Sequence, residues 1–232
     1  KSPSADASEE GLYAAICTAL LRGQLRPGTP LRERYLAEEF QVTRGLVRKV
    51  LLRLGQEGKL ELHANRGAYV PQPTREQVQE AYQARKALET GMLALLARQI
   101  SPAQIARMQA HLRAEREASQ SARREDSVKL AGDFHLLVAD MLGNDLLREM
   151  LQRLIARTQM YVALFEPAQS SDCASDEHEE VVAALVRGDV APAARAMLEH
   201  LAEVERRVLS RMGRAEPAPL ADILRTALQG DS

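Results

Sequence analysis

The sequence predicts a mainly α-helical protein, with an N-terminal winged helix-turn-helix that carries a small β-hairpin wing and an antiparallel helical bundle behind it. Leu, Ala, Arg and Glu dominate the composition, aromatic residues make up only 3% and Trp is absent, a bias that favours helix. Apolar residues recur at helical spacing along most of the chain. Only residues 60–70 show the short alternation, around Asn65 to Gly67, that is typical of a hairpin.

The composition changes at Pro71 and Pro73, where Gly-punctuated short elements give way to long helical patterns. Two prolines so close together interrupt regular structure, which makes this the expected domain boundary. We expect a disordered lead-in over residues 1–10, an N-terminal domain over 11–71 and a helical domain over 72–213. The tail, 214–232, carries the pattern of one further short helix, whose apolar side could pack on a partner subunit.

The two domains differ in charge, although the whole chain has a net charge of only −1. Residues 11–73 contain ten Lys or Arg and five Asp or Glu, a net charge of +5. Residues 74–232 contain twenty basic and twenty-four acidic residues, a net charge of −4. A basic domain joined to an acidic one indicates that the first part binds a polyanion.

Three helices precede the wing in the N-terminal domain. The first covers 12–21, a turn follows over 26–30, and the second runs over 33–40. Thr43 is a good N-cap for the third, which buries Val47, Val50, Leu51 and Leu54. Two short helices, a tight turn and a hairpin are the elements of a winged helix-turn-helix.

The third helix leaves hydrogen-bond donors at its N-terminus and on its outer face, as a helix that enters the DNA major groove requires. At the hairpin tip, the Arg66 cation and the backbone of Gly67, which has no side chain, would contact the DNA backbone or the minor groove. A charged helix face is often merely solvated, but the whole set in a basic domain favours DNA binding. The candidate DNA-binding residues of helix and tip are Arg44, Gly45, Arg48, Lys49, Arg66 and Gly67.

The N-terminal domain resembles the GntR family of bacterial transcription regulators. The resemblance rests on Leu25 to Leu31, Leu36 to Arg44, Val47, Arg48, Leu54, Glu57, Gly58 and Arg66 to Val70. It implies DNA contacts by Arg34, Thr43, Arg44, Arg48 and Gly67. The chain departs from the family pattern at Gly45, where a small polar residue is usual, and at Lys49, where Glu is common, and both changes bear on the operator sequence.

Residues 75–210 resemble the FadR-type (FCD) effector domain of the same family. The matching motifs are Arg85 to Glu89, Asp133 to His135, Gly143 with Asn144, Glu177 with His178, and Leu198 to Leu201. The resemblance implies a helical bundle in which one acidic residue and three histidines hold a metal. It also implies that a carboxylate effector binds at or beside that metal.

Three of the five histidines, His135, His178 and His200, lie on apolar stripes of three separate helices. A buried imidazole needs a partner, and three on packed helices indicate a shared site for a divalent transition metal such as Zn or Ni. The acidic ligand that the resemblance implies falls at Ala131, and Asp133 lies on another side of the helix. Water or an effector carboxylate would then complete the coordination, or the imidazoles would bind an anion without metal at mildly acidic pH.

Arg85 lies on the inward stripe of its helix, four residues before Glu89. Two interpretations stay open: an ion pair with Glu89 within the helix, and a bidentate clamp for an organic acid. We expect His63 and His111 to be surface residues, and Asn144 to cap a helix. The bundle helices are expected over 74–99, 102–119, 122–142, 145–166, 174–187 and 190–212.

The sequence therefore indicates a non-enzymatic, ligand-responsive transcription regulator, a repressor that binds a pseudo-palindromic DNA operator as a homodimer and is controlled by a small carboxylate. Two alternatives are a metal-dependent hydrolase that uses the three histidines, for which no catalytic motif is present, and a DNA-binding dimer whose sensor has decayed, which Ala131 suggests. We expect a cytoplasmic location, because no apolar run is long enough to span a membrane, and two reduced cysteines, Cys17 buried and Cys173 in a loop.

Overall fold

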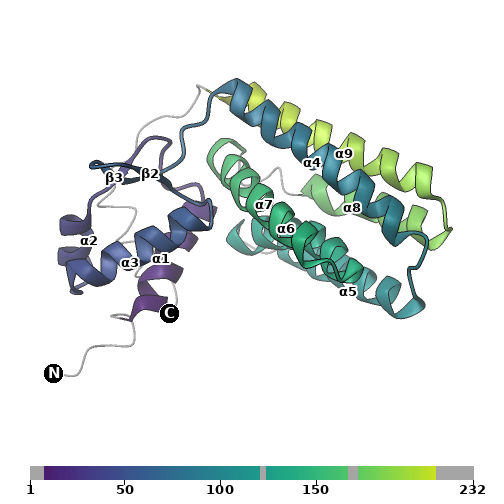
Figure 1. Ribbon diagram of the computed structural model, residues 1–232, viewed down its shortest axis with the longest axis horizontal. Helices are drawn as coiled ribbons and strands as arrows, with labels where there is room; N and C mark the ends of the chain where they lie inside the picture. Colours follow the sequence, from purple (N-terminus) through teal and green to yellow (C-terminus); the bar gives the residue numbers. More distant parts are fainter. Residues whose placement is uncertain (1–7, 121–123, 167–171, 213–232) are drawn as a thin grey trace.

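The N-terminal part of the protein is a three-helix unit with a small sheet (Figure 1). The structure, a computed structural model, describes residues 8–120, 124–166 and 172–212. The elements in order are α1 (Glu9–Leu21), β1 (Pro30–Leu31), α2 (Glu33–Glu39), α3 (Arg44–Gln56), β2 (Glu61–His63) and β3 (Gly67–Tyr69). We call this unit the head. The winged helix-turn-helix fold is thus confirmed.

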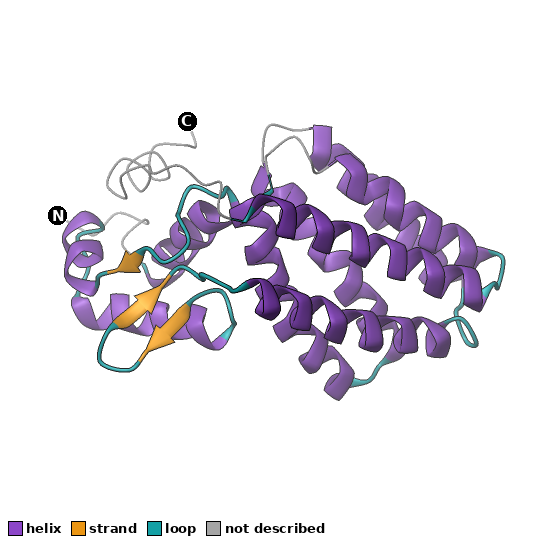
Figure 2. Cartoon of the chain, turned by 90° about the horizontal axis from the view of Figure 1, so that it is seen from above, coloured by secondary structure: helices purple, strands orange, loops and turns teal. Residues whose placement is uncertain are grey.

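The wing contains one strand more than the sequence indicated. The antiparallel sheet has the order β1–β3–β2, and Pro30, expected as the last residue of a turn, pairs with Tyr69. The chain turns at Gly28, whose φ of +76° favours glycine, and the Gly28 N–H donates to the Val70 carbonyl. This turn folds the segment back beside β3, and Figure 2 shows the three strands together on one side of the head.

The C-terminal part is a bundle of long helices: α4 (Arg75–Leu96), α5 (Pro102–Gln120), α6 (Arg124–Leu142), α7 (Asp145–Phe165), α8 (Asp172–Val186) and α9 (Val190–Arg211). Neighbouring helices pack in a closed ring, in the order α4, α9, α8, α5, α6, α7 and back to α4. Side chains that point inward from these helices therefore meet in one shared interior, which positions the site described below.

Caps explain why the helices begin where the sequence indicated. Thr43 accepts a hydrogen bond from the Leu46 N–H at the start of α3, and Asn144 accepts one from the Leu147 N–H at the start of α7. Thr74 and Gln77 form a reciprocal capping box at the start of α4. The predicted bundle helices agree with the observed ones within a few residues at each end.

Three smaller expectations were wrong. Glu9 and Glu10 belong to α1 rather than to a disordered lead-in, because Ser8 caps that helix. Cys173 lies within α8, not in a loop. Cys17 carries a free thiol but is only half-buried. The predicted tail helix, at 219–230, falls outside the described residues.

The head packs on the bundle through α1, which contacts α6 and α7. Met160 of α7 is only 1% exposed and belongs to the hydrophobic core of the head, together with α1 and α3 residues. Gly23, at the end of α1, approaches the Ala163 carbonyl so closely that a Cβ would lie 2.3 Å from the oxygen. Arg22 forms an ion pair of 2.6 Å with Glu125 of α6. One end of the bundle thus completes the head.

Across the described residues, we find no helix that is both long enough and apolar enough to cross a membrane.

Candidate functional site

The outer face of α3 presents the side chains that the sequence singled out. Val47, Val50, Leu51 and Leu54 are buried in the head, whereas the residues at the N-terminus and outer side of the helix are exposed: Arg44, Gly45, Arg48 and Lys49. The first turn contains no acidic residue. This end of α3 therefore offers donors and a positive helix terminus to an anion.

A hollow of about 440 Å³ brings this helix end together with the wing and the start of α2. Its lining includes Arg34, Arg44, Arg66 and Gly67, which are far apart in sequence. It also includes the exposed Arg32, which the sequence analysis missed. The signal available was its position two residues before Arg34, at the start of the second helix. Four guanidinium groups around one concave surface suit a phosphate backbone.

Two of the α3 cations are held by carboxylates of the head itself. Arg48 donates two hydrogen bonds of 2.8 Å to Glu33, and Lys49 pairs with Glu9 at 2.7 Å. The bonds from Arg48 lower the pKa of Glu33. Both cations remain largely exposed, with 63% of the Arg48 side chain and 69% of the Lys49 side chain open to solvent. Arg34 is held less tightly. Its side chain is 81% exposed, and its Nε lies 4.0 Å from a Glu38 carboxylate oxygen, which is a long distance for an ion pair.

The second site is the polar centre of the bundle. His135 of α6, His178 of α8 and His200 of α9 are 3%, 0% and 5% exposed. Each offers a ring nitrogen, and the three nitrogens lie within 4.8 Å of one another. The Nε2 atoms of His178 and His200 are 3.2 Å apart. The expectation that three helices bring these histidines together is thus met.

Each of these imidazoles has its own carboxylate on the Nδ1 side. Nδ1 of His135 lies 2.5 Å from Glu89 of α4, Nδ1 of His178 lies 2.9 Å from Glu115 of α5, and Nδ1 of His200 lies 2.6 Å from Glu177 of α8. An ionised carboxylate only accepts hydrogen bonds, so each Nδ1 donates. The Nε2 atoms are consequently left with free lone pairs.

Two lone pairs that face each other at 3.2 Å repel unless a cation lies between them. Two imidazole nitrogens on one tetrahedral zinc ion, each bonded at about 2.0–2.1 Å, would lie about 3.3 Å apart. A carboxylate on the far nitrogen is the usual support for a metal-binding histidine. The three histidines therefore fit a divalent transition metal.

Burial favours the neutral form of His135 and His200, which is the form that a metal ligand needs. It lowers the pKa of His135 to about 4, although Glu89 opposes the shift. Burial, together with the neighbouring His178 and His135, places the pKa of His200 well below its usual value. Burial alone would raise the pKa of Glu89, but Arg85 and His135 outweigh it and hold that pKa at about 2.

No carboxylate occupies the position at which the family pattern implies an acidic metal ligand. Ala131 occupies it, and Asp133 is half-exposed and pairs with Lys129 at 3.4 Å on another side of α6. Within the described residues, the metal-ligand cluster at this centre consists of the three histidines alone. Any fourth ligand would come from water or from a bound molecule.

Arg85 is buried beside the histidines, and it forms the ion pair that the sequence suggested. Its Nε donates to Glu89 at 2.6 Å, and its Nη1 donates to Thr158 of α7 at 3.0 Å. The third nitrogen, Nη2, is buried and has no partner among the described residues, and neither has the buried hydroxyl of Tyr82. Leaving such donors unpaired costs about 1–3 kcal/mol each, so an acceptor placed here would bind favourably.

Charged contacts continue from the histidines to the head. Glu177, which holds His200, also accepts from Arg207 of α9 at 3.3 Å, and Arg207 donates to Glu166 at 3.0 Å. Glu166 is the C-cap of α7, and its carbonyl accepts from Arg124. Arg124 is followed by Glu125, the partner of Arg22 in the head.

Among the other histidines, the expectation for His63 holds but that for His111 does not. His63 is exposed on the wing. His111 is half-buried, and its Nε2 lies 3.0 Å from the Leu130 carbonyl and 3.1 Å from Glu115. It therefore helps to hold the carboxylate that supports His178. The spacing of four between His111 and Glu115 was the available signal.

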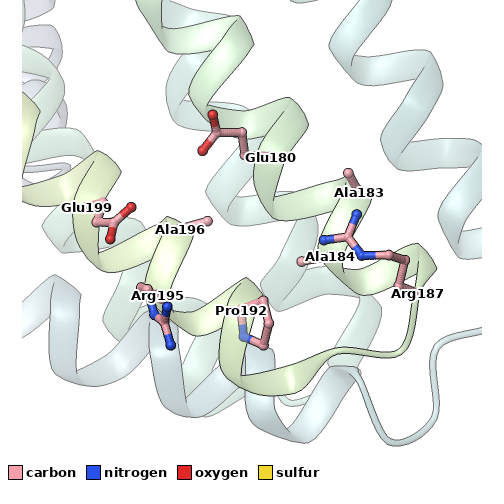
Figure 3. A pocket seen from close by; sticks show the side chains of 8 residues that line it. All are labelled: Glu180, Ala183, Ala184, Arg187, Pro192, Arg195, Ala196 and Glu199. Carbon is pink, nitrogen blue, oxygen red and sulfur yellow. The ribbon is translucent and has the colours of Figure 1, made fainter.

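A shallower hollow lies at the far end of the α8–α9 pair. Its volume is about 320 Å³, and Figure 3 shows the side chains that line it, among them the acidic Glu180 and Glu199 and the basic Arg187 and Arg195. No histidine lines it. It is therefore separate from the polar centre of the bundle.

A basic winged head on a bundle with a buried polar centre defines a DNA-binding regulator with a sensor domain. Residues 8–70 match the model of the "Bacterial regulatory proteins, gntR family", and residues 80–203 match that of the FCD domain. The chain belongs to the GntR family of transcriptional regulators, in its FadR-type subfamily with an FCD domain.

Curated relatives carry names of the same kind. The chain is 32% identical over 205 residues to the HTH-type transcriptional regulator LutR of Bacillus subtilis. This alignment covers 79% of the chain and 93% of LutR. It is 25% identical over 198 residues to the HTH-type transcriptional repressor RspR of Escherichia coli. That alignment covers 85% of the chain and 87% of RspR.

Among solved structures, a GntR regulator from Rhodococcus superposes with a TM-score of 0.72 at 20% identity, covering 87% of this chain and 97% of that one. This likeness supports the fold. Family and relatives together identify a non-enzymatic transcriptional regulator, which sets the hydrolase alternative aside.

Proposed function

We propose that the protein is a ligand-responsive repressor that binds a pseudo-palindromic operator as a homodimer and responds to a small carboxylate. The buried centre of the bundle carries this proposal: ring nitrogens of His135, His178 and His200 lie within 4.8 Å of one another, and a buried Arg85 nitrogen has no partner among the described residues. That centre has the properties of a site for a cation and an anion together. We also propose the division into a DNA-binding domain over 11–71 and an effector domain over 72–213.

DNA binding is assigned to the head. The hollow between α3 and the wing supports phosphate contacts by Arg32, Arg34, Arg66 and Gly67. The exposed N-terminus of α3 supports base contacts in the major groove by Arg44 and Arg48, with Thr43, Gly45 and Lys49 beside them. A regulator that reads bacterial DNA works in the cytoplasm, which is the location we propose.

Ligand sensing is assigned to His135, His178 and His200, which would hold a divalent transition metal such as Zn or Ni through their Nε2 atoms. When bound, the metal supplies a positive anchor for a carboxylate. Glu89, Glu115 and Glu177 keep the rings oriented. The Arg85 Nη2 and the Tyr82 hydroxyl would donate to the free end of the same carboxylate.

The contacts from Glu177 through Arg207, Glu166 and Arg124 support a route from this centre to the head. A ligand that shifts α9 against α7 would disturb the support of α1 and thereby the placement of α3. Such an effect needs different ligand contacts in two states of the bundle. We infer repression from the name of RspR, which is described as a repressor.

Two measurements test the proposal. Fluorescence anisotropy with DNA from the protein's own promoter should show specific binding that weakens steeply with salt. Thermal shifts should rise with Zn²⁺ or Ni²⁺ and rise further with one member of a panel of small carboxylates. Absence of specific DNA binding would refute the regulator. DNA binding without any stabilising ligand would instead establish the alternative that Ala131 suggests, a regulator with a decayed sensor.

A further inference from the structure

A hollow of about 530 Å³ lies where the head meets the bundle, and we call it the junction hollow. Its walls come from α1 and the end of α3 on the head side, and from α6 and α7 on the bundle side. Figure 1 shows the head beside the end of the bundle to which these helices lead. Small-molecule sites often lie between domains and measure roughly 300–1,000 Å³. The described residues that line the junction hollow include no histidine, so it is separate from the polar centre of the bundle.

On the head side, one hydrogen-bonded cluster forms the wall. The Tyr13 hydroxyl donates to Glu57 at 2.5 Å, and the Lys59 ammonium donates to Glu57 at 2.7 Å and to the Tyr13 oxygen at 2.6 Å. The Arg53 guanidinium lies over the Tyr13 ring, 4.0 Å from its centroid. Glu57 is the C-cap of α3, so this wall is attached to the helix that carries the candidate DNA contacts.

On the bundle side, Gln159 of α7 fastens the wall to α6. Its Nε2 donates to the carbonyls of Val128 and Lys129 at 3.1 and 3.2 Å. Gly132 makes room for this amide, because a Cβ at that position would lie 1.9 Å from the Gln159 nitrogen. Both walls are thus held by contacts within the protein, as in a site that is formed before its ligand arrives.

The surface between the walls is largely apolar. Ile155 and Ala156 of α7 line it and are buried, and Leu136 of α6 and Leu21 of α1 line it and are half-buried. An occupant with an apolar body would remove this surface from water, which favours binding.

The charged side chains of the lining balance one another, with three acids and three bases. Four of them form two ion pairs, Lys59 with Glu57 at 2.7 Å and Lys129 with Asp133 at 3.4 Å. These two pairs leave no net charge on their side of the hollow.

The remaining acid and base are Glu149 and Arg153 of α7. Both are exposed, and neither forms an ion pair within the described part of the chain. A spacing of four places them one turn apart on the same side of the helix. The hollow therefore presents one cation and one anion next to each other, beside an apolar surface.

We propose that the junction hollow is a second small-molecule site, which binds an α-amino acid with an apolar side chain. The carboxylate of the amino acid pairs with Arg153, its ammonium pairs with Glu149, and its side chain lies on Leu136 and Ile155. A carboxylate without the ammonium would face Glu149 unpaired, and an amine without the carboxylate would face Arg153 unpaired. The zwitterion satisfies both.

The position of the site gives its occupant a role in regulation. The occupant contacts head and bundle at once, so it binds best when the two are placed as they are in this structure. A ligand that favours one placement of the head also changes the affinity for DNA, and DNA changes the affinity for that ligand by the same factor. This inference goes beyond the proposed function, because the binding itself requires neither the histidine centre nor DNA.

Isothermal titration calorimetry of the full chain with L-leucine, L-methionine and L-phenylalanine tests the site. At least one should bind, and an analogue without the ammonium or without the carboxylate should bind about tenfold more weakly or worse. For L-phenylalanine these analogues are 3-phenylpropanoate and 2-phenylethylamine. Failure of all three amino acids to bind, or analogues that bind as tightly, would overturn the proposal.

Variants on α7 test the two charged contacts. Glu149→Gln and Arg153→Gln should each weaken binding of the amino acid about tenfold. Arg157→Gln is the matched control, because Arg157 is exposed one turn further along α7 and does not line the hollow. Equal affinities in the control and the two variants would show that these side chains do not hold the ligand and would overturn the assignment.

Cys17 reports where the amino acid binds. It lines the hollow and carries a free, half-buried thiol. In a Cys173→Ser background, the amino acid should slow the reaction of Cys17 with N-ethylmaleimide several-fold, and its binding should persist in EDTA. Binding that EDTA abolishes and that leaves the Cys17 reaction unchanged would place the amino acid at the histidine centre and overturn the inference. Confirmed binding in the hollow by a protein that binds no specific DNA would refute only the proposed function.

Discussion

Met160 provides a direct test of how strongly the head depends on the bundle. It belongs to α7 but is buried, at 1% exposure, in the core of the head. Replacement of a fully buried Met by Ala costs about 2–5 kcal/mol. A chain of this size loses about 2–4 °C in Tm per kcal/mol, so Met160→Ala should lower the Tm by about 4–20 °C.

The matched variant is Met108→Ala, because Met108 is fully buried in the core of the bundle alone. Both variants should lower global stability in urea to a similar degree. Only Met160→Ala should speed amide hydrogen exchange in α1 and α3 relative to the bundle helices, because it removes support from the head. Equal rates of amide hydrogen exchange in α1 and α3 of the two variants would refute the view that the bundle completes the core of the head.

Three further predictions concern the two sites and the pH dependence. His178→Ala should abolish the thermal stabilisation by Zn²⁺ or Ni²⁺, while His63→Ala, at an exposed wing position, should keep it; stabilisation that survives in both would place the metal elsewhere. Arg44→Ala should weaken operator binding about tenfold or more in anisotropy and relax specificity, whereas Arg66→Ala should chiefly reduce the salt dependence; identical changes would contradict these roles. Burial raises the pKa of Glu57, but Lys59 and Tyr13 outweigh it and leave the pKa lowered, so this carboxylate stabilises the folded state above its unfolded pKa near 4.3 and loses that effect as the pH falls further. In urea denaturation, the free energy of unfolding should therefore fall less from pH 5 to pH 3 in Glu57→Gln than in the wild type. An equal fall in both proteins would exclude a contribution of the Glu57 carboxylate to stability.

The helices could be predicted from the sequence because their signals are local. The periodicity of apolar residues and the caps at Thr43 and Asn144 act within one or two turns, and the structure confirms them. The meeting of His135, His178 and His200 was also predictable, since each lies on an apolar stripe and such stripes must share one core. Here local patterns and global packing agree.

The partners of those histidines were missed because they depend on contacts between helices. Glu115 reads as an ordinary surface acid on a largely polar helix, yet it is 4% exposed and holds His178. A pair between Glu89 and Arg85 was one of two open interpretations, and neither included the contact with His135 that the packing of α4 on α6 creates. Strand β1 and Met160 were missed for the same reason, since each joins a core that is distant in sequence.

The enclosure of the histidine centre has a consequence for the speed of any response. Each of the six bundle helices contributes a polar side chain to the centre, and the three imidazoles are at most 5% exposed. A molecule held there can enter or leave only when helices part, so its residence time is set by the opening of the bundle and not by diffusion. Such a sensor would retain its occupant through brief fluctuations of concentration outside and would report a time average of its surroundings.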